Sequence, residues 1–232
     1  AFKEKKFKAV AINVNSPGGS PVQSELIFQR IKELSKEANI PVFTFARDVA
    51  ASGGYFILCA GDEIYAHDSS IIGSIGVISS SFGFEKAIKK IGVERRIYTE
   101  GKNKAVLDPF SPEDPDNIKI LKAVQKDIFA NFKGIVKDAR GKKLKKPDST
   151  LFTGAFWSGT ESKKIGLIDE IGNMREIMGK KFGKKIEFVE IKEKKKGLIK
   201  DLLSTKLDTF SENLIDNVFD KVEENCSWTR FK

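Results

Sequence analysis

A serine flanked by glycines is the residue of this chain best suited to chemistry. Ser52 stands in the stretch Ala50–Gly54, and Lys104 follows later in Gly101–Lys104. A serine hydroxyl becomes a nucleophile when a neighbouring group removes its proton, and an uncharged lysine amine can do so. The one histidine, His67, stands at the end of an expected strand, where such residues are more often exposed or hydrogen-bonded than catalytic. The pattern predicts a serine hydrolase whose base is Lys104.

An amine base places a demand on its surroundings. A lysine takes protons near neutral pH when its pKa falls from about 10.4 to roughly 7 or 8. This change is worth about 4 kcal/mol, which burial against apolar neighbours can supply. Most of the 41 lysines and arginines are expected at the surface, so the base must be shielded from water.

Glycines near Ser52 predict backbone donors for a developing negative charge. Ser52 lies between an expected strand and an apolar helix, which leaves its own N–H and that of Gly53 at the positive end of the helix. The loop Ser16–Gly19 supplies a second wall, where the Gly19 amide can approach a substrate closely. Such preorganised donors are worth about 3 kcal/mol each in acyl transfer. Each motif alone also fits an ordinary turn, and together they favour an oxyanion hole.

Composition limits the class of protein. The chain has 232 residues, of which 40% are hydrophobic, and a net charge of +9. This length is enough for one substantial core. The basic residues are mostly interleaved with acidic ones, and the lysine clusters at 142–146 and 194–196 are expected to be solvated. With no aromatic residues set among them, a nucleic-acid partner is not expected.

Cysteine usage and hydropathy exclude other classes. Cys59 lies in an apolar run typical of a core, and Cys226 lies near the C-terminus, so neither a disulfide framework nor a zinc site is expected. No apolar run reaches the ~20 residues that cross a bilayer. The chain begins at Ala1 and enters a strand almost at once, which predicts a preceding segment outside this sequence.

Strand and helix patterns alternate along the chain. Ser20 is expected to cap a helix that begins at Pro21, and Gly141 is expected to end the longest helix. Strands are expected at 8–14, 41–46, 63–66, 95–98 and 186–191, a glycine-punctuated stretch at 72–78, helices at 21–37, 55–60, 85–91, 114–139 and from about 173, and one more helix–strand unit through 168–170. This order predicts a parallel, layered α/β sheet.

The end of the chain has a different pattern. Beyond Gly197, apolar residues recur every three or four positions, as in an amphipathic helix or helix pair: Ile199, Leu203, Leu207, Phe210, Leu214 and Val218. Packing on the body or on a neighbouring subunit is favoured over membrane-surface binding, because the polar face is acidic. The sequence therefore predicts a domain at 1–191 and a helical tail at 192–232.

Four motifs resemble those of one family. Asn15–Ser20, Ala50–Tyr55, Ile72–Ile78 and Gly166–Gly172 are similar, in order and spacing, to motifs of the bacterial signal peptide peptidase A (protease IV) family, including its SohB-like members. The resemblance extends from about Lys8 to Phe182. It implies a Clp-protease-like (crotonase-like) fold, a layered β-α-β superhelix with a parallel sheet.

The resemblance also implies roles for particular residues. A Ser/Lys dyad falls on Ser52 as nucleophile and Lys104 as base. The hydroxyl that holds the lysine amine in place falls on Ser74. The oxyanion amides fall on Gly19 and Gly53.

Members of this family cleave signal-peptide remnants and other unfolded or membrane-derived peptides without a metal or other cofactor. They are anchored by an N-terminal segment, face the extracytoplasmic (periplasmic) side and assemble into ring-shaped homo-oligomers. This chain has no membrane-spanning segment before Lys8 and no counterpart for the stretch after about 191. Membrane association is therefore expected through a segment absent from this sequence.

Two other functions fit the same fold. A crotonase-type acyl-CoA enzyme would share the oxyanion hole, but it would need acidic catalytic residues and a nucleotide-binding surface, and it would not use Ser52. A non-catalytic scaffold of a membrane complex would keep the fold alone. Both dyad candidates are present in the chain, which favours the peptidase.

Overall fold

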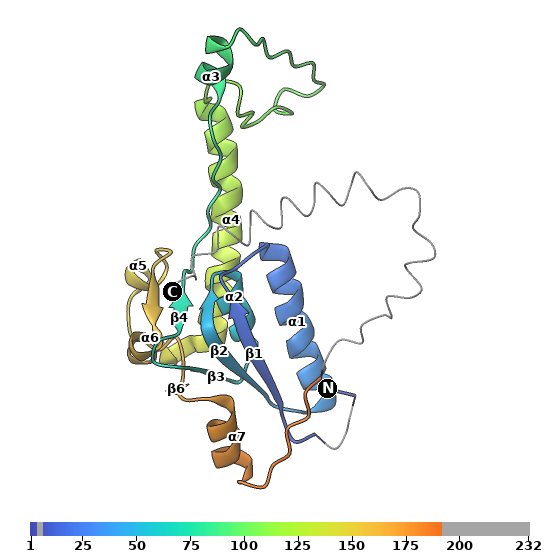
Figure 1. Ribbon diagram of the computed structural model, residues 1–232, viewed down its shortest axis with the longest axis vertical. Helices are drawn as coiled ribbons and strands as arrows, with labels where there is room; N and C mark the ends of the chain where they lie inside the picture. Colours follow the sequence, from blue (N-terminus) through green and yellow to red (C-terminus); the bar gives the residue numbers. More distant parts are fainter. Residues whose placement is uncertain (4–6, 192–232) are drawn as a thin grey trace, which may run out of the picture. The chain divides into compact units, whose positions relative to one another are not determined.

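The computed structural model describes residues 1–3 and 7–191 (Figure 1). Residues 1–187 form one compact unit. The whole of the helical tail expected at 192–232 lies outside the described residues, with Cys226 and the lysines at 194–196.

A sheet built around one long strand forms the centre of the compact unit. β2 (Val42–Ala51) pairs in parallel with β1 (Val10–Ser16), β3 (Glu63–Ala66) and β4 (Ile71–Gly73). β6 (Glu170–Ile171) continues the sheet in parallel beside β3, and β5 (Phe156–Ser158) pairs antiparallel with β4. The order is β5-β4-β2-β3-β6, with β1 along β2, so the expected parallel α/β sheet is confirmed with one antiparallel strand at its edge.

A bulge in β2 bends the sheet beside the expected active site. Val14 pairs with Ala46 but Ser16 pairs with Ala50, so β2 carries two more residues than β1 here. The Asn15 side chain fills this irregularity: its oxygen accepts from Val49 N at 3.1 Å, and its amide donates to the next residue back, Asp48. β2 can thus pair with β3 through residues 43–45 and with β4 through 49–51.

Helices connect the strands and cover the sheet. They are α1 (Pro21–Ala38), α2 (Gly53–Leu58), α3 (Glu85–Lys90), α4 (Pro115–Arg140), the 3-10 turn η1 (Gly141–Lys143), α5 (Asp148–Leu151), α6 (Gly159–Ile165) and α7 (Met174–Phe182). Ser20 occupies the N-cap of α1 before Pro21, as expected, but its side chain makes no capping bond. Asp114 caps α4 by accepting from Asp116 N at 2.8 Å.

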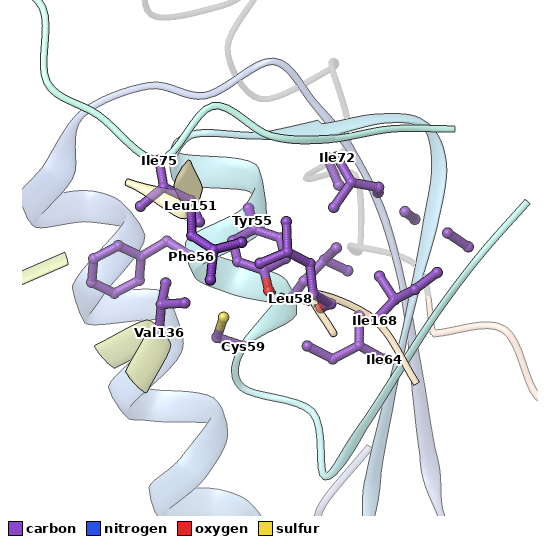
Figure 2. Packing of buried hydrophobic residues seen from close by; sticks show 14 of the residues in the cluster. Tyr55, Phe56, Leu58, Cys59, Ile64, Ile72, Ile75, Val136, Leu151 and Ile168 are labelled. Atoms are coloured by element: carbon purple, nitrogen blue, oxygen red, sulfur yellow. Dashed lines mark hydrogen bonds between the residues drawn. The ribbon is translucent and has the colours of Figure 1, made fainter. Parts of the chain in front are cut away.

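The core lies between the sheet and the helices α2, α4 and α6. Figure 2 shows apolar side chains from these elements packed around α2, with Tyr55, Leu58 and Cys59 in the middle of the cluster. The Phe56 ring stacks on Phe132 of α4, with ring centroids 5.0 Å apart. Burying such side chains contributes roughly 1.5–3 kcal/mol each, so α2 is fixed on its buried side.

A buried ion pair joins the end of α4 to the strand β6. The Arg140 guanidinium is buried and donates to both carboxylate oxygens of Asp169, at 2.7 and 3.2 Å. It also donates to Gly166 O. Asp169 in turn accepts from Ile64 N of β3 at 2.8 Å, and Lys143 adds a second cation. These bonds fix the stretch 166–172 against the sheet.

The stretch 77–113, called the arm below, lies away from this core. α3 and the rest of the arm lie at the end of α4 farthest from the sheet (Figure 1). Phe84 N donates to Pro109 O, Phe84 stacks on Phe110, and Arg95 pairs with Asp108. Within the described part of the chain, all hydrogen bonds, ion pairs and ring contacts of residues 77–113 stay inside the arm.

Two strand expectations are corrected. Residues 95–98 form no strand, and neither do residues 186–191. Neither stretch has a neighbouring strand that could satisfy its backbone groups, and a β pattern needs such a partner to become a strand. The stretch 72–78 is a strand only to Gly73.

Candidate active site

Ser52 occupies a sharp turn between β2 and α2. Its backbone has φ 51° and ψ −120°, a conformation that residues other than glycine rarely adopt. The half-buried Ser52 donates its N–H to Gly73 O of β4 at 2.8 Å. The strand before the turn and the buried helix after it thus fix the serine in a strained conformation, as is common at functional sites.

The glycine loop before α1 approaches Ser52 closely. Gly18 has φ 137°, and a Cβ on it would lie 2.9 Å from Ser52 Cβ and 3.3 Å from Ser52 Oγ. Ser16 Oγ holds this loop, lying 3.2 Å from both Gly18 N and Gly18 O. A side chain at Gly18 would therefore collide with the serine, so the loop can pass here only as glycine.

Two backbone N–H groups lie beside the serine without partners. A Cβ on Gly53 would lie 3.2 Å from Gly19 N, which places the two residues side by side. Among residues 1–3 and 7–191, neither Gly19 N nor Gly53 N has a hydrogen-bond partner. Nothing lies within 4 Å of a Cβ built on Gly19. Two partnerless N–H donors beside a hydroxyl can bind an oxyanion.

Ser74 adjoins this arrangement through the backbone. It has φ 51°, follows Gly73, and donates its N–H to Ala155 O at 2.7 Å. Since Ala51 pairs with Gly73 and Gly73 O accepts from Ser52 N, the two serines follow the ends of neighbouring parallel strands. The structure thus brings together Ser52, Gly19 and Gly53, with Ser74 next to them.

Lys104 is placed elsewhere. It is exposed, and in the arm its N–H donates to Gly101 O at 3.1 Å. No residue of α4 before Phe132 is buried, and the 17 residue steps from Pro115 to Phe132 span roughly 25 Å of helix. Within one chain, the arm that carries Lys104 is therefore held away from the core around α2.

Neither His67 nor Cys59 competes as a reactive group. His67 is exposed and contacts Ser70 through its backbone. Cys59 is fully buried, and burial raises the pKa of its thiol to about 12. A thiol with this pKa stays protonated at neutral pH and is a poor nucleophile.

Sequence reasoning missed three residues of the site. Gly18 touches Ser52, Gly73 accepts from it, and Trp157 packs on Gly73. The double glycine at 18–19 is the signal that could have found Gly18. Nothing local marks Trp157, because its contact with Gly73 depends on the pairing of β5 with β4.

Other candidate sites can be stated briefly. An open depression of about 580 Å³ lies at the C-terminal end of α1, lined by residues such as Lys32, Asn39 and Asp62 and by none of the predicted site residues. No group of three or more His, Cys, Asp or Glu side chains in the described residues could hold a metal ion. The helices described are each too short or too polar to cross a membrane.

Comparison with known proteins agrees with this geometry. The model of Peptidase family S49 matches residues 34–185. The putative signal peptide peptidase SppA of Enterococcus faecium is 30% identical over 171 residues, which cover 73% of this chain and 49% of that protein. Protease 4 of Haemophilus influenzae is 36% identical over 184 residues, covering 78% and 29%.

A relative from Brucella abortus extends over the whole chain. It is named Na(+)/H(+) antiporter NhaA and is 48% identical over 239 residues, which cover 100% of this chain and 32% of the relative. The chain therefore spans about a third of the length of this relative. The family match covers the serine turn and the stretch 166–172, and the resemblance to signal peptide peptidase A is confirmed. The chain belongs to peptidase family S49.

Proposed function

We propose that this chain is a serine endopeptidase that hydrolyses signal-peptide remnants or other membrane-derived or unfolded peptides with a Ser/Lys dyad. The observation that supports this most is Ser52 itself, held at positive φ beside the partnerless N–H groups of Gly19 and Gly53. Peptidase-named relatives support the same class of reaction.

In the proposed mechanism, the uncharged amine of Lys104 takes the proton of Ser52 Oγ as this oxygen attacks a peptide carbonyl carbon. The carbonyl oxygen becomes an oxyanion and accepts from Gly19 N and Gly53 N. The protonated amine then gives its proton to the leaving nitrogen, which breaks the peptide bond. Water repeats the sequence on the acyl-enzyme. Ser74 Oγ holds the amine in place.

The position of Lys104 supports assembly of the dyad between two copies. The arm exposes large apolar side chains, among them Phe82 (78% exposed), Ile91 (74%) and Tyr98 (90%). Contiguous exposed apolar surface is typical of a protein interface. We infer that a neighbouring copy covers the arm and receives Lys104 beside its own Ser52. Repetition of this contact around an axis closes a ring-shaped homo-oligomer.

The fold and location are proposed on the same basis. The curling sheet and its short helices fit the Clp-protease-like, crotonase-like layering that family membership suggests. Membrane association through a segment outside this chain, with the site on the extracytoplasmic side, fits peptide substrates of membrane origin. The match to part of a relative named Na(+)/H(+) antiporter supports a place at a membrane. Protease protection of the full-length protein in sealed vesicles tests the side.

A fluorophosphonate probe tests the function directly. We expect covalent labelling at Ser52 of the full-length protein, located by mass spectrometry, and none in Ser52→Ala. Lys104→Met should lower the labelling rate by about 100-fold or more, since general-base catalysis contributes 10²–10⁴. Labelling of the wild type should rise as the pH increases from about 6 to 9, because the base must be uncharged.

Lys102→Met is the matched control, because Lys102 is an exposed lysine of the same loop, two residues away. It should label at the wild-type rate. A folded wild-type protein that stays unlabelled and cleaves no peptide would contradict the peptidase and leave the scaffold and the acyl-CoA enzyme. Equal losses in Lys102→Met and Lys104→Met would remove Lys104 as the base.

A further inference from the structure

We propose that Trp157 is a positioning residue of this active site: its indole holds Gly73 and Ser74 in the conformation that orients Ser52. Because it concerns the same site, the assignment rests on the proposed peptidase function. Trp157 contacts no reacting atom and acts through the backbone of β4.

The contact between Trp157 and Gly73 is direct. A Cβ built on Gly73 would lie 2.8 Å from both Cε3 and Cζ3 of the Trp157 ring. The ring therefore occupies the space that a side chain at position 73 would take. Gly73 has φ 109°, where a side chain would also be strained. The indole of Trp157 packs against the backbone of Gly73, so a side chain at position 73 would collide with the ring.

Gly73 connects Trp157 to Ser52 through a hydrogen bond. Its carbonyl accepts the Ser52 N–H at 2.8 Å, at the point where the serine has φ 51°. The next residue, Ser74, also has φ 51° and is held by Ala155 O. Two successive residues with positive φ, Gly73 and Ser74, thus lie at the Trp157 ring, and Ser52, also at positive φ, is hydrogen-bonded to the first of them. Such conformations persist only where the surroundings over-determine them.

The backbone of β5 is a weak support without the ring. β5 has three residues, lies at the sheet edge and pairs with β4 at Ile71, Ile72 and Gly73 only. Short two-stranded pairs are marginally stable by themselves. Successive side chains of a strand point to opposite faces: Phe156 is 65% exposed, whereas Trp157 packs against the core. Trp157 is therefore the side chain that anchors β5 and, with it, the turn.

The test compares Trp157→Ala with Phe156→Ala in the full-length protein. Both variants remove an aromatic ring from β5, but only the first removes the contact with Gly73. A misplacement of the serine by about 1 Å costs up to 10²-fold in rate. We expect Trp157→Ala to lower kcat for peptide cleavage and the fluorophosphonate labelling rate about 10- to 100-fold with KM changed less than about threefold. Phe156→Ala should match the wild type.

Two further variants exclude a general loss of folding. Trp157→Phe, which keeps a flat ring, should recover most of the rate, whereas Trp157→Leu, which keeps apolar volume without the ring, should not. Since Trp157 holds both Gly73 and Ser74, the losses of Trp157→Leu and Ser74→Ala should be less than additive in the double variant.

The outcomes separate this assignment from the proposed function. A wild-type protein that neither labels nor cleaves would mean that the peptidase proposal fails. An active wild type with unchanged kcat in Trp157→Ala and Trp157→Leu would overturn the role of Trp157 and leave the peptidase intact. A loss carried by KM alone, or equal losses in Phe156→Ala, would overturn it too.

Discussion

Ser52 and Ser74 each keep a left-handed backbone, with φ 51°, at a cost of about 1–3 kcal/mol per residue. Hydrogen bonds to neighbouring strands hold both: Ser52 N to Gly73 O, and Ser74 N to Ala155 O. The cost is therefore offset by the sheet, and the serine hydroxyl is kept beside free donors instead of turning into the core.

Gly53 offers a test of the donor pair. In Gly53→Ala the new Cβ would overlap Ser24 Oγ of α1 and lie 3.2 Å from Gly19 N. Because Ser24 is buried and bonded to Ser20 O, the two helix starts must move apart. We expect fluorophosphonate labelling at Ser52 to fall about 100-fold, comparable to the loss of one oxyanion donor.

The control for this variant is Gly134→Ala in α4. Gly134 is also helical, but no atom lies within 4 Å of its Cβ position. We expect a wild-type labelling rate and a free energy of unfolding raised by about 0.5–1 kcal/mol. If Gly53→Ala labels as fast as Gly134→Ala, the Gly19 and Gly53 amides do not form the oxyanion hole.

For single residues, the sequence predicts the site residues that a local sequence pattern identifies. Glycines beside Ser52 and at positions 18–19 indicate close backbone approach wherever they occur. Trp157 carries no such mark, since an apolar residue in an apolar stretch fits any core. Its role depends on a strand pairing between distant residues. Lys104 remains a prediction, because its partner is not reached within one chain.

At the level of the elements, the sequence predicts some strands correctly and misplaces others. β3 is found at its true bounds, since its apolar run is bounded by turn residues. β2 is expected to end at Ala46 and continues to Ala51, because the exposed Arg47 and Asp48 look like a loop and are a bulge. Residues 95–98 have β-type composition but no partner strand, and partners come from tertiary structure.

The Arg140–Asp169 pair predicts a pH dependence of stability. Burial alone would raise the pKa of Asp169, but hydrogen bonds from Arg140, Lys143 and Ile64 N outweigh it and lower the pKa below the ordinary 3.8. A lowered folded-state pKa stabilises the fold above the unfolded value, and the gain disappears as the pH falls through the folded value. Asp169→Asn should therefore lose roughly 3 kcal/mol at pH 7, and this difference should shrink below about pH 4.

Urea unfolding at several pH values measures this difference. Glu161→Gln is the control, because the Lys164–Glu161 pair is exposed, with side chains 67% and 43% accessible. Exposed pairs contribute about 0–1 kcal/mol. A loss in Asp169→Asn that is the same at pH 3 and pH 7 would show that packing, rather than the charge pair, stabilises the stretch 166–172.

On the scale of the whole molecule, the arm separates Lys104, the proposed base, from Ser52, the proposed nucleophile. Two inactive proteins, Ser52→Ala and Lys104→Met, test whether copies share a site. After mixing and reassembly, a Lys104→Met copy can receive the lysine of its Ser52→Ala neighbour. Random assembly should restore about a quarter of the wild-type peptide cleavage. Each variant alone should remain inactive.

A dyad formed within one copy predicts no recovery, because no copy in the mixture has both residues. Lys102→Met mixed with Ser52→Ala provides the control, with activity in proportion to the Lys102→Met copies present. Light scattering on the same samples reports whether the copies assemble at all.

The global arrangement is the part that sequence reasoning describes least. The α4 pattern predicts one long helix from Asp114 to Gly141, and the structure has it from Pro115 to Arg140. Its apolar stripe looks continuous, so nothing in the sequence indicates that only the last third is buried. The buried residues begin at Phe132, where α2 packs on α4 through Phe56.

Because only the last third of α4 is buried, a small tilt of this helix moves its other end by a larger distance. A rod pivoting at the Phe132–Phe56 stack by about 5° carries its distal tip through about 2 Å, given 1.5 Å of rise per residue. Conversely, a contact that displaces the arm end of α4 acts on the Phe56–Phe132 stack, which lies one helical turn after Ser52. In the proposed assembly, a neighbouring copy bound to the arm would thereby act on the turn that holds Ser52.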